Sequence, residues 1–235
     1  MSITIAFPVG YRPVLKHGEH DQSSHGSWAT GVGYKESDKH PKYDFNSSEG
    51  PDVEYYTSSG YSDINKFLRS GKSIDLDEGW SKEELKGFIE SIDKEMDKTS
   101  APRDMVLFRG TSGVGKFDNL KEGDVFVDKA YVSTTPNIET VSGFMSTALG
   151  GSFDSRPFEK GYVFEISVPK GNKVLSMNNY FKGVSSKHGP SADIRTENEH
   201  ILPRGTKFKV DSISTIDVRG ATDKLIKVSV VKDEK

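Results

Sequence analysis

The pattern of hydrophobic residues changes once along the chain, near residue 104, and this change limits the folds that the chain can adopt. From residue 61 up to this point, apolar residues recur at helical spacing; after it, they form short runs of β-branched and aromatic residues separated by glycine and proline. Helices followed by strands indicate an α+β fold rather than alternating β-α-β units. No strand-linked G-x-G-x-x-G and no Walker loop occurs in the sequence, so we exclude Rossmann and P-loop folds.

Two helices are expected before the change. Ser62 can cap the first, and Gly71 gives its end. The second begins with the capping-box sequence Ser-Lys-Glu-Glu at 81–84 and ends at Ala-Pro, 101–102. Their apolar faces consist of Ile64, Phe67 and Leu68, and of Leu85, Phe88, Ile89, Ile92 and Met96.

The second half is expected to form short strands. They are 105–108, 125–127, 130–133, 162–168, 173–175, 196–202, 207–210, 213–218 and 225–231.

Composition divides the chain and excludes several functions. Residues 1–52 are rich in glycine, serine, histidine and charged residues without lasting apolar periodicity, so we predict a flexible or partner-ordered arm before a folded domain, 53–235. The sequence has no cysteine, which excludes a disulfide framework, a thiolate nucleophile and iron–sulfur ligation. Its net charge of −3 argues against a dedicated nucleic-acid coat, and no apolar run has membrane-spanning length or the form of a signal peptide.

Two polar motifs stand at predicted strand ends. Arg109, followed by Gly110, could present its planar guanidinium to a phosphate or carboxylate, or simply pair with a neighbouring acid. Ser-Thr-Thr at 133–135 offers hydroxyls that could orient a carboxylate or contact a ribose, but also suits a strand-to-turn junction.

The third motif is the pair Glu197 and Glu199, just before a short apolar run. If the segment is a strand, both side chains face one side with Cα atoms about 6.5–7 Å apart. Adjacent carboxylates raise each other's pKa and suit a site where positive charge develops. The alternative is a solvated edge strand whose acids discourage aggregation.

The order of these motifs resembles that of the arginine–serine–glutamate class of mono-ADP-ribosyltransferases, which includes bacterial toxins. Residues 61–69 are similar to the N-terminal helix of that family, 107–110 to its arginine strand and 131–135 to its serine-threonine-serine motif. Residues 197–208 are similar to its two-glutamate segment with the following Leu-Pro-Arg. The resemblance covers most of 56–235 and implies helices packed on a mainly antiparallel, two-sheet β core.

The resemblance implies a role for each site residue. NAD would be the substrate, and its nicotinamide–ribose bond would break through an oxocarbenium-like cation, as in glycoside hydrolysis. Glu199 would stabilise that cation, Ser133 would orient Glu199, and Arg109 would hold the phosphates. The backbone of Gly110 would meet the nicotinamide amide, and Phe144 would pack on the nicotinamide ring, unless Phe144 is a core residue.

The acceptor would depend on Glu197, because a glutamate there accompanies arginine acceptors in this family. A carboxylate can bind a guanidinium in a bidentate manner and help it lose a proton. The expected activity is therefore NAD-dependent transfer of ADP-ribose to arginine side chains of target proteins. Two positions depart from the family pattern, Thr135 in place of serine and Asp193 where an aromatic residue is frequent in the acceptor loop, 176–196.

The arm carries a resemblance of its own. Residues 16–26 are similar to a short motif of tailed-phage head and portal-associated proteins. This predicts a phage-encoded protein that could be carried in the virion and act on host proteins in the host cytoplasm. Side chains in this segment could ligate a metal, but the chemistry needs none and we expect no metal. They are His17, His20, Asp21 and His25.

Three alternatives remain open from the sequence. The chain could be an NAD glycohydrolase that uses water as acceptor, or it could modify a nucleic acid. It could also be a phage head protein with a decayed transferase domain and no activity.

Overall fold

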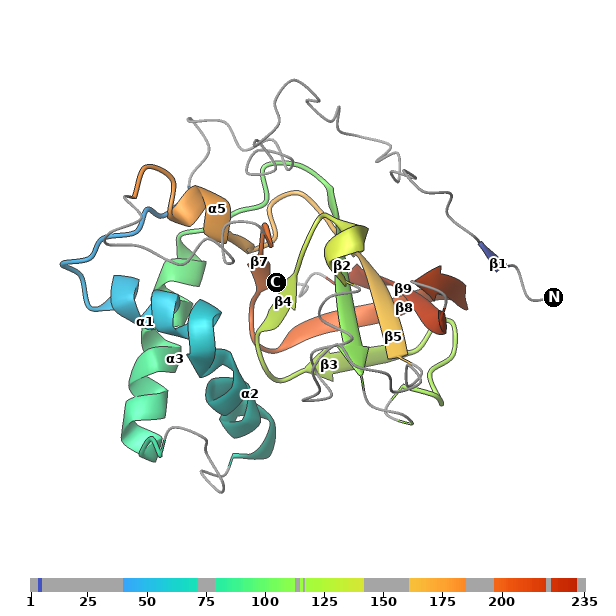
Figure 1. Cartoon of the computed structure of the whole chain (residues 1–235), viewed down its shortest axis with the longest axis horizontal. Helices are drawn as coiled ribbons and strands as arrows, with labels where there is room; N and C mark the ends of the chain where they lie inside the picture. The colour runs from blue at the N-terminus through green and yellow to red at the C-terminus, as the bar shows by residue number, and fades with distance from the viewer. Residues whose placement is uncertain are drawn as a thin grey trace.

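The computed structural model describes residues 4–5, 40–71, 79–112, 115, 117–141, 161–184, 197–218 and 221–231. The helices between residues 49 and 97 lie to one side of its strands (Figure 1). This is the α+β arrangement that the sequence predicts. None of the helices in these ranges has the length and apolar character to cross a bilayer.

The helical layer has three main segments. Helix α1 (Glu49–Tyr55) runs through a π-helical turn, η2 (Tyr56–Gly60), directly into α2 (Tyr61–Ser70). Gly71 ends α2 in the left-handed region at φ 67°, as predicted. Helix α3 (Lys82–Asp97) begins with the predicted capping box, in which the Ser81 hydroxyl and the Glu84 carboxylate each accept from the other's backbone N–H.

The strands of the described residues form two sheets. The larger has the order β1 (Thr4–Ile5), β8 (Thr206–Val218), β9 (Ala221–Val230), β5 (Gly161–Val168), β2 (Met105–Ser112), and β3 (Val125–Asp128) pairs with one end of β8. The smaller has the order β4 (Val132–Thr134), β7 (His200–Leu202), β6 (Leu175–Ser176). Only β1–β8 and β5–β9 among these pairs are parallel, which confirms the mainly antiparallel two-sheet expectation.

The small sheet lies between two cores. Val132 and Leu202 belong to the core of the large sheet, whereas Ile201 packs with the helices. Because neighbouring residues of a strand face opposite sides, Ser133, which pairs with Ile201, faces the helical layer. This alternation sets which side of the sheet the motif residues can reach.

Three of the predicted strands differ most from the observed ones. The predicted strands 207–210 and 213–218 form one strand, β8, with a register shift between Val210 and Ser212. The predicted strand 196–202 contributes only β7, because Glu197 and Asn198 form a turn in which Asn198 has φ 49°.

The predicted boundary at residue 52 falls inside α1. Residues 40–48, assigned to the arm from composition, contact the short helix α5 (Met177–Tyr180) through a hydrogen bond from Tyr43 N to Tyr180 O of 2.9 Å. Their polar composition hid this packing because a few aromatic contacts anchor them. The division into an arm and a catalytic domain remains a proposal, but these contacts place residues 40–48 with the folded domain.

Candidate active site

Three segments far apart in sequence are joined side by side at the site. Phe108 in β2 and Thr135 after β4 exchange backbone hydrogen bonds of 2.7 and 2.9 Å. Strand β4 in turn pairs with β7, with Ser133 opposite Ile201. The arginine, hydroxyl and glutamate motifs therefore meet, as their order predicts.

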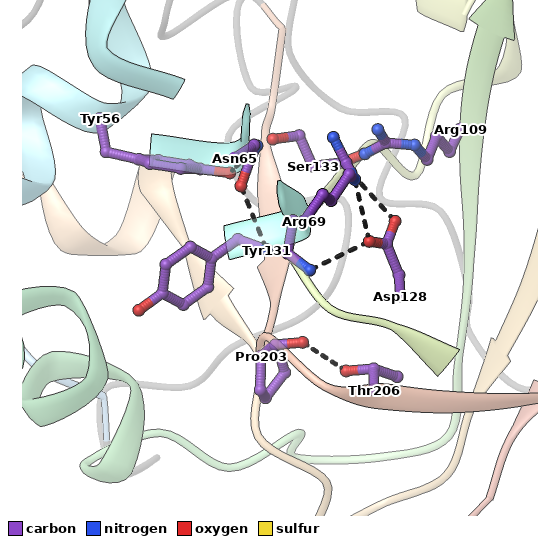
Figure 2. Close-up of polar contacts among 10 residues, drawn as sticks. Tyr56, Asn65, Arg69, Arg109, Asp128, Tyr131, Ser133, Pro203 and Thr206 are labelled. Carbon is purple, nitrogen blue, oxygen red and sulfur yellow. Dashed lines mark hydrogen bonds and ion pairs between the residues drawn. The ribbon is translucent and has the colours of Figure 1, made fainter. Parts of the chain in front are cut away.

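Arg109 lies within β2, not at its end as the sequence suggested. Its guanidinium is partly buried and donates to the carbonyl of Ser133 over 3.1 Å (Figure 2). Burial lowers the pKa of Arg109, while the charge of Asp128 opposes that shift and the charge of Arg69 adds to it. The guanidinium is thus fixed by β4 and stays cationic.

A second arginine stands beside the first. Arg69 on α2 forms a bidentate ion pair with Asp128 of β3, with N–O distances of 3.2 and 3.1 Å (Figure 2). The sequence reasoning did not single out either residue. The sequence did contain a sign of Arg69, because Asn65 and Arg69 are four residues apart and therefore form a polar face of the predicted helix.

Ser133 is in contact with a buried tyrosine as well as with the catalytic candidate. Its side chain hydrogen-bonds with both Glu199 and Tyr56. Tyr56 is fully buried at the start of η2, and Asn65 Nδ2 donates to its hydroxyl over 3.1 Å. Burial and, secondarily, the charge of Glu199 raise the pKa of Tyr56 to about 12, so it stays protonated. Sequence reasoning missed Tyr56, although π-helical turns often mark functional sites.

The two glutamates occupy the turn before β7, not a strand, so the predicted side-by-side strand geometry was wrong. The turn is fastened by hydroxyls of the Ser-Thr-Thr motif. Thr135 Oγ1 donates to Glu197 O over 3.0 Å, and Thr134 Oγ1 donates to His200 O over 2.5 Å. Any hydroxyl can donate in this way, which accounts physically for threonine at position 135.

The carboxyl group of Glu199 has a raised pKa. Burial raises its pKa to about 7, its hydrogen bond with Ser133 opposes the rise, the charge of Glu197 adds to it, and Arg109 lowers it. A carboxylate poised near neutrality among a cation, a hydroxyl and a second acid is typical of a catalytic site.

One carboxylate of helix α3, that of Asp93, contacts both the segment before β4 and the segment after β7. Asp93 accepts from the Tyr131 hydroxyl over 2.6 Å and from Arg204 over 2.9 and 2.7 Å. Tyr131 precedes β4, and Arg204 belongs to the Leu-Pro-Arg sequence after β7. This carboxylate therefore ties together the segments that carry Ser133 and Glu199.

Comparison with known proteins decides the family. The model of the family "ADP-ribosyltransferase exoenzyme" matches residues 33–233. The chain belongs to the ADP-ribosyltransferase exoenzyme family.

Relatives agree with this assignment. Exoenzyme T of Pseudomonas aeruginosa is 29% identical over 195 residues, which are 79% of this chain and 40% of that protein. The chain thus spans two fifths of that relative's length.

Solved structures share the fold of the family. The Vis toxin of Vibrio splendidus, an ADP-ribosyltransferase solved in complex with agmatine, aligns with a TM-score of 0.60 and 22% identity over 89% of this chain and 86% of that one. The ADP-ribosylating toxin BECa of Clostridium perfringens, solved with NADH, aligns with a TM-score of 0.56 and 18% identity over 80% of this chain and 44% of that one.

The remaining predicted positions of this exoenzyme-family chain are placed as follows. Gly110 follows Arg109 in β2 and pairs with Val163 of β5. Phe144 and Asp193 lie outside the described residues, as do the four metal-ligand candidates of the arm. Within the described ranges, no group of three or more histidine, aspartate or glutamate side chains is arranged to hold a metal.

Two neutral histidines lie next to the glutamate turn, His200 in hydrogen-bond contact with it and His40 in contact with the neighbouring strand β6. His200 is fully buried and donates from Nδ1 to Asn198 O over 2.8 Å. His40 Nε2 accepts from Ser176 N over 3.0 Å. Burial lowers the pKa of both rings to about 4 against opposing backbone hydrogen bonds, and the charge of His40 adds to the shift of His200.

We expect the domain to lose stability as pH falls from about 6.5 to 4, because the unfolded histidines bind protons there while the folded ones do not. Glu199 acts in the opposite direction, since its raised pKa contributes stability at low pH that is lost as pH rises through about 7. The two histidines outweigh the one carboxyl, so acidification should lower the free energy of unfolding. Each histidine contributes on the order of 1–3 kcal/mol to this loss. Urea unfolding across this range measures it. His40→Gln should flatten the dependence, and an unchanged slope would contradict the assignment.

Proposed function

We propose that the chain transfers ADP-ribose from NAD to arginine side chains of target proteins and releases nicotinamide. Membership of the exoenzyme family supports NAD as the donor. One observation carries the proposal for this chain, the hydrogen bond between Ser133 and Glu199 beside the guanidinium of Arg109.

The chemistry assigns a separate task to each group. The bond between ribose C1′ and the nicotinamide nitrogen breaks, its electron pair leaves with nicotinamide, and positive charge develops on the ribose. The ionised carboxylate of Glu199 stabilises that charge, and Ser133 holds the carboxylate in position. This electrostatic contribution is effective because the groups are already in place before the reaction begins. Arg109 binds the phosphates, and the backbone of Gly110 binds the nicotinamide amide. Phe144, which the resemblance assigns to nicotinamide packing, stays part of the proposal.

Arginine is proposed as the acceptor because of Glu197. Its carboxylate can hold a guanidinium in a bidentate manner and take the proton that the attacking nitrogen loses when it bonds to C1′. The relative Vis was solved with agmatine, a small guanidine compound, which supports a guanidine acceptor in this fold.

Radiolabelled NAD incubated with the protein and a cell lysate tests the function. We expect labelled proteins whose label is released by hydroxylamine, and mass spectrometry should map ADP-ribose to arginine. Free ADP-ribose without labelled protein would identify a glycohydrolase, and label removed by nuclease would identify nucleic-acid modification. No turnover of NAD would leave only the binding role of a phage head protein.

Glu197→Gln should separate transfer from NAD cleavage. We expect transfer to agmatine to fall about 10²-fold, because the amide cannot accept the guanidinium proton, while NAD hydrolysis changes less than about threefold. Glu83→Gln, at an exposed position in the first turn of α3, is the matched control and should alter neither rate. Equal losses of transfer and hydrolysis in Glu197→Gln would contradict its acceptor role.

The partners and place of action belong to the same proposal. Target proteins in a host cytoplasm would be the acceptors, and carriage in a phage virion rests only on the resemblance of residues 16–26, which lie outside the described residues. Co-purification with capsid proteins tests that part separately.

A further inference from the structure

Phe45 is the most exposed large apolar side chain of the described residues, with 63% of its surface accessible. It is not on a loose loop. Asp44 accepts from Asn46 N through its side chain over 2.9 Å and from Ser47 N through its carbonyl over 3.2 Å. Gly50 closes the turn, since a Cβ there would lie 2.2 Å from the Asp44 carbonyl oxygen. The turn therefore holds Phe45 outward in a fixed position.

The segment before this turn is fastened to the start of the acceptor loop. Tyr43 N donates to Tyr180 O over 2.9 Å, and the Tyr43 ring packs on Phe181 with 5.0 Å between centroids. Lys42 Nζ donates to Asn179 O over 3.3 Å. In Figure 1 the chain leading into α1 runs next to α5, as these contacts require.

The same helix, α5, contacts the glutamate turn through its first two residues. Met177 N donates to Glu199 O over 2.9 Å, and Asn178 Nδ2 donates to Asn198 Oδ1 over 2.9 Å. The path from Phe45 through Tyr43, along α5 and across to Glu199 is at most about 25 Å long, which sets an upper limit on the distance between Phe45 and Glu199. A protein partner that covers about 800 Å² spans about 30 Å. A protein whose arginine reaches Glu197 can therefore cover Phe45 as well.

The charge around Phe45 indicates what kind of protein fits. Between residues 40 and 56 there are one lysine and four carboxylates, Lys42 against Asp44, Glu49, Asp52 and Glu54. Lys94 pairs with Glu49, so part of this charge is compensated. An excess of negative charge beside an exposed aromatic side chain complements a basic surface with an apolar recess.

We propose that the Phe45 turn, residues 42–47, is a docking surface for the acceptor protein, and that the acceptor is a basic, arginine-rich protein. The proposal rests on the arginine-transferase function above and adds a second contact site for the partner. Phe45 is the apolar anchor, and α5 connects it to the glutamates. Small guanidines, which reach only the glutamates, do not use this surface.

Steady-state kinetics with two acceptors test the docking surface. The acceptors are agmatine and purified core histones, which are basic and rich in arginine, at saturating NAD. Phe45→Ala should raise KM for histones about five- to tenfold, the usual effect of losing an aromatic anchor, and leave KM for agmatine and NAD hydrolysis unchanged. Phe45→Leu should recover part of the loss. Val127→Ala, which removes another exposed apolar side chain on the edge strand β3, is the matched control and should change nothing.

The outcomes separate the two proposals. An unchanged histone KM in Phe45→Ala, with wild-type modification of both acceptors, overturns the docking surface and leaves the transferase function standing. Equal rises of KM for histones and agmatine also overturn it, because the effect would then lie in the site itself. If the wild type hydrolyses NAD but modifies neither acceptor, the transferase function fails and the docking surface falls with it.

Discussion

Glu199→Gln is expected to lower kcat for NAD cleavage by about 10³-fold, whether water or a guanidine is the acceptor. The amide keeps a hydrogen-bonding group for Ser133 but brings no negative charge to the developing cation, and losing one such preorganised contact costs about 10²–10³. Release of labelled nicotinamide measures cleavage directly. Cleavage at the wild-type rate would contradict the proposed mechanism.

The stability of the same variant provides its control. Since burial disfavours the charged form of Glu199, a neutral glutamine should leave the melting temperature at pH 8 unchanged or higher. A large fall in melting temperature would instead mean that the loss of activity reflects misfolding. In the wild type, kcat/KM for NAD should rise with pH through about 7, because only the ionised carboxylate stabilises the cation.

Arg109→Ala is expected to lower kcat/KM for NAD by between 10² and 10³, in hydrolysis and transfer alike. The guanidinium is held against the Ser133 carbonyl, so the substitution removes a support of β4 together with the proposed phosphate contact. Arg109→Lys should recover only a small part, because an ammonium group cannot form the bidentate contact.

The control for Arg109 is Arg103→Ala, at a partly exposed arginine just before β2. It should retain wild-type kinetics. A loss in Arg109→Ala confined to transfer, with hydrolysis intact, would move Arg109 from the phosphates to the acceptor. The pair of variants at 109 and 197 thus separates donor binding from acceptor binding.

The proposed docking surface would give a function to the packing of residues 40–48. This segment contributes little apolar surface, so its composition suggested an arm. It is nevertheless fixed by Tyr43 against α5 and by His40 against Ser176. A segment pinned at the rim of the acceptor loop can influence which protein binds without contacting NAD.

Several features could be predicted because they depend on local chemistry. The Ser81 capping box and the left-handed Gly71 follow from residues that contact one another within a turn. The order of arginine, hydroxyl and glutamate motifs likewise identified the family. Glu199, Ser133 and Arg109 could be proposed as site residues because each is part of a short, recognisable sequence.

The sequence by itself determined the secondary structure of most segments, the fold class and the motifs that meet at the site, since hydrophobic period and capping act over a few residues. Only the tertiary structure decided that Glu197 and Glu199 lie in a turn, that Arg69 pairs with Asp128, and that Tyr56 contacts Ser133. Arg69 and Asp128 are 59 positions apart, and Tyr56 and Ser133 are further apart still, so these two contacts form only when the helices pack beside the strands. Periodicity carries no information over that range, because burial and electrostatic fields depend on which distant side chains close around a group.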